Sequence, residues 1–335
     1  MKNLVSIMLC TFLMGALNVS VSAGAKFDIA IGGGSFDGHT TYQIGGRVDM
    51  DYPDGTSESY NSHFPISELE FPLDVYIGSI KGSIEFARTW KLSLCGKGNI
   101  FPKNIFPNDA GKMKDSDWLV ADSLDIYSKS DAELDALIID INVRYTLYEG
   151  YHRDTPWNTP GATHSNIKWS YFVGGGYIYE NFDYEMTDLD QWYPSSPSTP
   201  HDYVSGLALK YEVTYDIPYL EIGTQFNFND RFLIEMSLGG SLIVHVEDVD
   251  NHVLRSLVAK TDYGWGGEAL LYSVEGRYNF TKSCFLTLGF DYKTINAEGR
   301  SKTVEETEEG TFNHTIDQEI ESEQMSGSLM VGLTF

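Results

Sequence analysis

Two short acidic motifs hold the residues whose types and spacing suit chemistry. One reads MKDSDW and the other reads DVDNH. Residues i and i+2 point to the same side of an extended segment, so Asp115 and Asp117 would form a carboxylate pair. By the same spacing, Asp250 and His252 would form an acid–imidazole pair.

These pairs suit hydrolysis by an activated water. A carboxylate beside a histidine fixes the tautomer of the imidazole and raises its basicity, so the ring could draw a proton from a water held opposite the carboxylate pair. Two close carboxylates also push their pKa values apart, which lets one of them hold a proton.

A cation site is a second interpretation, because Asp248, Asp250 and His252 could supply ligands. The motif lacks the patterned glycine of a calcium loop, which weakens this second interpretation.

The charge balance limits the class of partner. The chain of 335 residues carries 48 acidic and 23 basic side chains, a formal net charge of -25. Phosphate binding needs a basic face, so the composition argues against nucleic acid and against docking on anionic lipid. It suits a cationic partner or a self-repelling exterior. Asp-x-Asp pairs are common in so acidic a chain, so composition alone does not establish catalysis.

The N-terminus is predicted to be a secretory signal peptide. Lys2 supplies a positive charge, residues 4–17 are largely apolar, and residues 21–23 (VSA) form a small-residue cleavage site. We therefore expect a signal peptide at residues 1–23 and a single barrel domain at residues 24–335.

The rest of the chain alternates between apolar and polar residues in the manner of β-strands. In residues 137–146, 232–239, 270–279 and 285–292, one face is apolar or aromatic and the other is polar, small or charged. A charged inner face is wrong for the core of a soluble β-sandwich, the alternative fold, but is typical of a transmembrane barrel. Because backbone groups in lipid must all be paired, such a sheet has to close. The alternation that ends at Phe335 resembles the C-terminal signal of bacterial outer-membrane barrels.

The predicted fold is all-β: a ten-stranded antiparallel transmembrane β-barrel with long extracellular loops. Short turns at residues 229–230 and 281–283 alternate with long polar connections, as they do in barrels with short periplasmic turns. Residues 148–166 are an exception, a long segment on the side of the short turns. Both acidic motifs lie in or beside outer loops. The strands are predicted near residues 26–48, 61–87, 91–105, 131–147, 167–186, 204–228, 231–247, 263–280, 284–297 and 314–335, and the long connections at 49–60, 106–130, 187–203, 248–262 and 298–313.

In type, order and loop, the two motifs resemble the active-site motifs of the omptin family of outer-membrane endoproteases, which are ten-stranded barrels. The first resembles Met-x-Asp-x-Asp-Trp of the second outer loop, and the second resembles Asp-x-Asp-x-His of the fourth. The resemblance extends over most of the mature chain. Residues 27–32 resemble the first strand of the family, residues 211–219 the sixth and residues 329–335 the last.

The resemblance implies a role for each member of the two pairs. Asp250 and His252 would be the dyad that activates the nucleophilic water. Asp115 and Asp117 would be the opposing carboxylate pair, with Asp115 nearest that water.

The resemblance also implies a pocket for a basic P1 residue. Asp248 would lie at its base and attract Arg or Lys through a charge-assisted bond, while Met113 would be an apolar wall. Family members that cleave at paired basic residues carry a second pocket acid near the top of the first strand, where the nearest acid here is Asp37.

The family's lipid A site uses basic residues on the outer wall. The counterparts here, Asn181 and Thr214, are not cationic, which argues against dependence on lipopolysaccharide.

We therefore expect an aspartic-type endopeptidase in the bacterial outer membrane, with its active site facing the cell exterior. It would hydrolyse peptide bonds near basic residues in cationic peptides or proteins, as a monomer without cofactor or metal. The alternative is a non-enzymatic barrel of the same fold that acts as an adhesin or structural protein and binds through its acidic rim. Convergence of the two pairs across the barrel mouth, with room for one water, would favour the enzyme. His245 could also face the lumen near this site.

Overall fold

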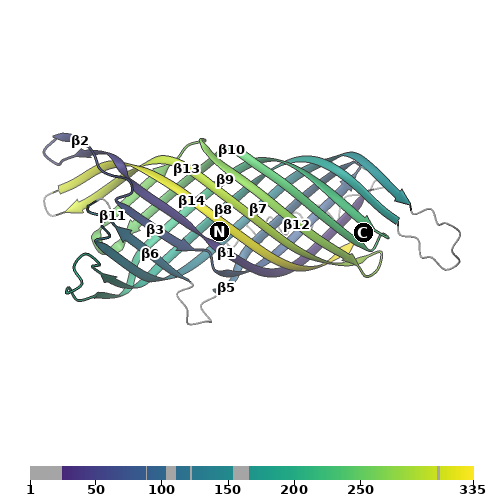
Figure 1. Cartoon of the computed structure of the whole chain (residues 1–335), viewed down its shortest axis with the longest axis horizontal. Helices are drawn as coiled ribbons and strands as arrows, with labels where there is room; N and C mark the ends of the chain where they lie inside the picture. The colour runs from purple at the N-terminus through teal and green to yellow at the C-terminus, as the bar shows by residue number, and fades with distance from the viewer. Residues whose placement is uncertain (1–24, 88, 103–110, 121–122, 154–165, 308–309) are drawn as a thin grey trace.

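The chain folds into a long barrel of tilted antiparallel strands (Figure 1). The computed structural model describes residues 25–87, 89–102, 111–120, 123–153, 166–307 and 310–335. The elements are β1 (Lys26–Asp51), β2 (Ser57–Asn61), β3 (Ser67–Pro72), β4 (Val75–Phe86), β5 (Trp90–Pro102), β6 (Lys112–Asp117), β7 (Ile126–Arg153), β8 (Asn166–Trp192), β9 (Asp202–Phe228), β10 (Phe232–His252), the 3₁₀ turn η1 (Val253–Arg255), β11 (Leu257–Asp262), β12 (Gly267–Asn279), β13 (Cys284–Thr307) and β14 (Gly310–Thr334).

Ten strands close the ring. In the order of hydrogen bonding they are β1, β4, β5, β7, β8, β9, β10, β12, β13 and β14, and β14 pairs with β1. At this closure the N–H of Phe335 donates to the carbonyl oxygen of Phe27 at 2.8 Å. A closed ring satisfies the backbone groups that lipid would leave unpaired. The predicted ten-stranded antiparallel barrel is confirmed.

The barrel is apolar outside and charged inside. On the outer face, Leu220 and Leu242 are 75% and 79% exposed. In the lumen, Arg144 lies between Glu221 and Glu235, pairs with both, and keeps only 14% of its side chain exposed. This inversion of a soluble fold is what a lipid-embedded barrel requires. Among the described residues, no helix has the length and apolar character needed to cross a membrane.

Toward one end, the left of Figure 1, three strands of the ring are replaced by later or earlier pieces of chain. Here β3 takes the place of β4 beside β1, β6 takes the place of β5 beside β7, and β11 takes the place of β12 between β10 and β13. Because β3 also pairs with β6, and β10 with β11, the ring continues with ten strands beyond the apolar band. Both acidic motifs lie in this extension, which we call the upper ring.

Several segments predicted as loops are paired strands in the upper ring. Residues 106–130 include β6, residues 248–262 include the end of β10 and all of β11, and residues 298–313 extend the β13–β14 pair. The physical reason is that a ladder of backbone hydrogen bonds can continue above the membrane. There the strands need no apolar face, so the sequence lacks the alternation that would identify them. The predicted signal peptide and residues 154–165 lie outside the described residues.

Candidate active site

Strand β6 presents the first acidic motif to the inside of the upper ring. Asp115 pairs with Leu69 of β3, and Met113 pairs with Ser130 of β7, so β6 is an integral strand whose alternate residues point inward. Met113 is 2% exposed and lies on the membrane side of the motif. Asp115 and Asp117 follow it toward the barrel mouth.

Strand β10 presents the second motif from a wall separated from β6 by β7, β8 and β9. Val246, Asp248 and Asp250 alternate on the luminal face and are at most 4% exposed. His252 is the last residue of β10, and its Nε2 lies 3.0 Å from Oδ2 of Asp250. The expected acid–imidazole pair is therefore formed, and it stands on a strand where the sequence predicted a loop.

Tyr42 of β1 connects the two motifs across the lumen. Its hydroxyl donates a hydrogen bond to Oδ2 of Asp250. In the sheet, Tyr42 pairs with Leu69, which pairs in turn with Asp115, so the three form one lateral row. Burial, then the charges of Asp250, Asp248 and Asp115, raise the pKa of Tyr42 well above its usual value. Tyr42 belongs to neither motif, and its only sequence signal is that of an aromatic residue near the end of the first predicted strand.

Asp115 and Asp250 each keep one carboxylate oxygen for a further partner. The Oδ1 atoms of both residues are buried and receive no hydrogen bond from the described part of the chain. A buried oxygen without a donor costs free energy, so a water or a substrate N–H would be stabilised at either atom. Burial and then the charge of Asp117 raise the pKa of Asp115 to about 7. This carboxyl group therefore exchanges a proton near neutral pH.

The imidazole of His252 is tuned by opposing effects. Burial lowers its pKa, but the charge of Asp250 and the hydrogen bond to it outweigh burial, so the pKa of His252 is raised above its usual value. Arg255 of η1 opposes this rise through its own positive charge. Because Nε2 faces Asp250, the hydrogen-bond network assigns the proton to Nε2 and leaves Nδ1 as the proton acceptor.

Asp248 lies one inward-facing position deeper than Asp250. The hydroxyl of Tyr263 and the amide of Gln318 donate to its Oδ2 at 2.9 and 2.8 Å, and the hydroxyl of Tyr211 donates at 3.3 Å. Burial raises the pKa of Asp248 to about 7, although the hydrogen bonds act in the opposite direction. The result is a deep carboxyl group close to its point of half-ionisation at neutral pH.

An aromatic cluster surrounds these acids and accounts for their desolvation. The rings of Phe71 and Tyr211 stack with centroids 4.1 Å apart, Tyr42 lies 5.5 Å from Tyr211, and Tyr184 lies 5.3 Å from Phe71. All four side chains are buried. Apolar walls lower the local dielectric, which strengthens every charge interaction inside the site.

The cation-site interpretation of the second motif gains little from this geometry. Oδ2 of Asp248 accepts hydrogen bonds from three neutral groups, and Oδ2 of Asp250 faces Tyr42 and His252. O–H and N–H donors would turn their positive ends toward a bound cation. These oxygens are thus arranged to receive hydrogen bonds and not to ligate a metal.

Three other residues singled out from the sequence lie on the outer face of the barrel. Asp37 is on the opposite side of β1 from buried Phe36, so it does not reach the pocket as a second acid. Asn181 donates to Thr214 at 3.2 Å and to Glu212 at 2.9 Å. The outer wall at this place is neutral to acidic.

Comparisons with known proteins agree with this architecture. A sequence profile described as the omptin family matches residues 57–335. Among solved structures, the outer membrane protease OmpT from Escherichia coli matches with a TM-score of 0.69 and 14% identity, over 92% of this chain and 97% of that chain. The translocator domain of the autotransporter NalP from Neisseria meningitidis matches with a TM-score of 0.31 and 9% identity, over 100% of this chain and 97% of that chain, which is too dissimilar to support an argument. No curated protein sequence matches the chain.

The closed ring defines a β-barrel, and the omptin profile makes it an outer-membrane barrel of the protease class. The profile match covers most of the chain, so this chain belongs to the omptin family. The family predicted from the two motifs is confirmed. At 14% identity, the likeness to OmpT shows the fold alone.

The Asp250–His252 contact can be tested without any assumption about activity. Replacing Asp250 with Asn removes the charge that raises the pKa of His252, so that pKa should fall. Arg255→Gln is the opposite control, because it removes a positive charge and should raise the same pKa. Both values are measured by NMR titration of the labelled imidazole in detergent micelles. An unchanged pKa in Asp250→Asn would show that the two side chains do not interact in solution.

Proposed function

We propose that this chain is an outer-membrane endopeptidase that hydrolyses peptide bonds near basic residues with an activated water. The dyad of Asp250 and His252 would activate the water opposite Asp115 and Asp117. The supporting observation is a buried Oδ1 atom on each wall, in Asp115 and Asp250, that receives no hydrogen bond from the described residues. The contact between Tyr42 and Asp250 connects the two walls. A water or a substrate N–H would satisfy either atom.

The proposed reaction begins with neutral His252. Its Nδ1 takes a proton from the water as the water oxygen attacks the scissile carbonyl carbon, and Asp250 stabilises the imidazolium that forms. The C–N bond then breaks, and the proton on Nδ1 passes to the leaving amine. The products are a free carboxyl group and a free amine, and His252 returns to its neutral state.

The opposing carboxyl groups would hold one proton between them. Asp115 is raised to a pKa of about 7 by burial and by the charge of Asp117, so one of the two acids can be protonated at neutral pH. A protonated Asp115 can donate a hydrogen bond to the carbonyl oxygen as negative charge develops on it. Donors aimed at this charge in a site with apolar walls are a main source of rate enhancement.

The pocket for a basic side chain would end at Asp248. This residue lies deeper in β10 than Asp250, so a side chain that extends past the dyad would bring its charged end to this carboxylate. Met113, buried on β6, would contact the aliphatic stem. The luminal residues at the matching place in β1 are Thr40 and Tyr42, which are both neutral. We therefore propose a single-acid pocket that selects positive charge without strict preference for arginine.

We place the site outside the cell. The opposite end of the barrel carries tight connections such as Asn229 and Asp230, whose φ values of 55° and 57° suit a two-residue hairpin turn. Short turns face the periplasm in barrels of this class. The net charge of -25 would then attract cationic peptides to the mouth.

Because Asn181 and Thr214 carry no positive charge, we propose that activity does not depend on lipopolysaccharide.

Peptide cleavage tests the proposal directly. The refolded mature chain should hydrolyse a fluorogenic peptide with one internal Arg or Lys, and His252→Ala should lower kcat by about 10²- to 10⁴-fold because the base is lost. His201→Ala is the matched control. His201 also contacts a carboxylate, that of Asp190, but it belongs to neither acidic motif. Unchanged cleavage in His252→Ala would overturn the mechanism. A folded barrel without any cleavage would favour the adhesin alternative.

Selectivity should follow the charge of Asp248. Asp248→Asn keeps the shape but removes a charge-assisted bond, so kcat/KM for a peptide with Arg or Lys at P1 should fall by about 10- to 100-fold. A peptide with a neutral residue of similar length at P1 should lose much less. Equal losses on the two peptides would show that Asp248 does not contact the P1 side chain.

The pH dependence of kcat/KM should be bell-shaped. Activity should rise as His252 loses its proton above its raised pKa, and should fall as Asp115 loses the proton that would stabilise the oxyanion, near pH 7. The charge of Asp117 raises the pKa of Asp115, so Asp117→Asn should move the alkaline limb to lower pH. An alkaline limb that stays in place or moves upward would rule out this role for Asp115.

A further inference from the structure

A separate group of side chains lies on the outer face of β10, around His245. Its neighbours Val244 and Val246 point into the barrel and are fully buried, so His245 points away from the lumen. The sequence left open that His245 faces the lumen, but the alternation of β10 carries it outward. Two residues nearer the membrane, Ile243 is 55% exposed on this same face. His245 therefore lies at the upper edge of the apolar band.

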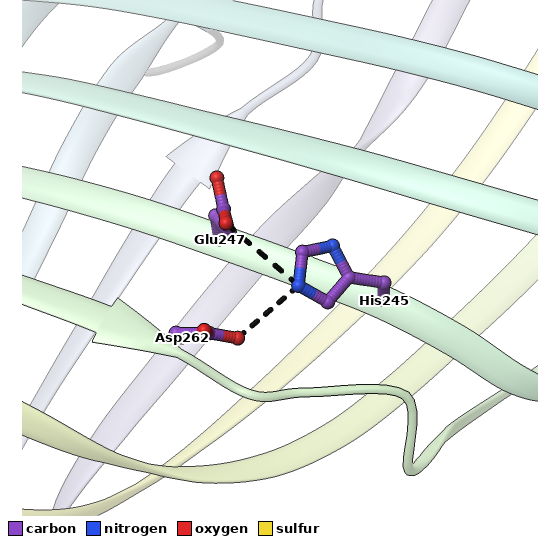
Figure 2. Close-up of side chains that lie close together, drawn as sticks. All are labelled: His245, Glu247 and Asp262. Atoms are coloured by element: carbon purple, nitrogen blue, oxygen red, sulfur yellow. Dashed lines mark hydrogen bonds and ion pairs between the residues drawn. The ribbon is translucent and has the colours of Figure 1, made fainter.

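Two carboxylates converge on one ring nitrogen of His245 (Figure 2). Nε2 lies 3.1 Å from Oδ1 of Asp262 and 3.8 Å from Oε1 of Glu247. The three potential ligand atoms all lie within 4.8 Å of one another. They come from two strands, β10 and β11, whose pairing holds Glu247 directly opposite Asp262.

The other side of the imidazole is held by a second set of contacts. Nδ1 lies 3.4 Å from Oδ2 of Asp216 on β9, and the hydroxyl of Tyr177 donates to the other oxygen of Asp216. The indole of Trp265 stacks on the imidazole with ring centroids 5.0 Å apart. A histidine that ligates a metal typically donates its second N–H to a carboxylate in this way, which leaves the lone pair of the first nitrogen for the ion.

We propose that His245, Glu247 and Asp262 bind one divalent transition-metal ion of the zinc class at the membrane edge. Tetrahedral zinc with bonds of about 2.0–2.1 Å places its donors about 3.3 Å apart, close to the two distances at Nε2. The N–H of Gly264 donates to Oδ1 of Asp262 at 2.8 Å and fixes this carboxylate beside the ring. The side chain of Glu247 is 60% exposed, so it can rotate to close the shell. The exposed side leaves a fourth position for water or another ligand.

Charge and ligand type favour this ion over the simpler ion-pair arrangement. The positive charge of Lys302 also acts on Asp262. With it, three carboxylates around a protonated imidazole leave one negative charge at the edge of a low-dielectric layer, and a divalent ion with neutral His245 leaves none. The imidazole selects against calcium and magnesium, which prefer an all-oxygen shell.

Metal titration of the refolded chain tests the proposal. A His252→Ala background removes the competing imidazole of the candidate active site. In detergent micelles at pH 7.5, calorimetry should detect one tightly bound Zn²⁺ per chain, and Co²⁺ should quench the fluorescence of Trp265. His245→Gln should abolish both signals. Asp216→Asn should weaken zinc binding by about 10- to 100-fold, because it removes only the partner of Nδ1.

Two variants make the outcome decisive. His201→Gln is the matched control, because His201 contacts Asp190 at 3.0 Å and stacks on Trp192 but belongs to no three-ligand group among the described residues. It should leave zinc binding unchanged. Trp265→Phe should keep zinc binding and remove the quenching, which locates the ion beside that ring. The same bound zinc in His245→Gln, or equal losses in His245→Gln and His201→Gln with the barrel intact by circular dichroism, would overturn the proposal.

Discussion

The pairing of β1 with β14 is the contact on which the rest of the molecule depends. In lipid, an unpaired N–H or C=O has no water to bind, so a sheet can cross the membrane only when its first and last strands meet. Closure then dictates the reversed distribution of side chains, with leucines such as Leu220 outside and Arg144 among acids inside. It also provides a rigid ring on which strands can continue past the lipid. The two acidic motifs use this continuation, so their geometry is set by backbone ladders on each side.

Burial of several acids in one place requires compensation, and the upper ring supplies it from neutral groups. Tyrosine hydroxyls and one glutamine amide reach Asp248, and Tyr42 reaches Asp250. These donors are dipoles, so they stabilise the carboxylates without cancelling their charges. The aromatic rings that carry the hydroxyls exclude water at the same time. A single residue type therefore meets both demands of the site, low dielectric and satisfied hydrogen bonds.

Much of the fold and of the candidate site could be predicted because the membrane imposes a period of two on every strand that crosses it. The alternation around residues 137–146 and the spacing within each acidic motif followed from local geometry. The strand character of β6 and of the end of β10 could not be predicted. Above the lipid both faces of a strand meet protein or water, so the alternation of apolar and polar residues is weaker. The partnership of Tyr42 with Asp250 depends on the stagger of strands around the whole ring, which no local segment encodes. The direction of the His245 side chain can be stated only when it is known which alternate residues of β10 face the lumen.

The depth of Asp248 has a consequence for the thermodynamics of recognition. An acid with a pKa of about 7 is an even mixture of neutral and charged forms at neutral pH, so a cationic side chain that entered the proposed pocket would have to expel part of a proton. Uptake of the cation would then be linked to proton release and would weaken in acid. An uncharged side chain would carry no such linkage, and it would compete better as the medium becomes acidic. The preference of the proposed pocket for cationic over uncharged side chains would thus depend on the pH of the surroundings.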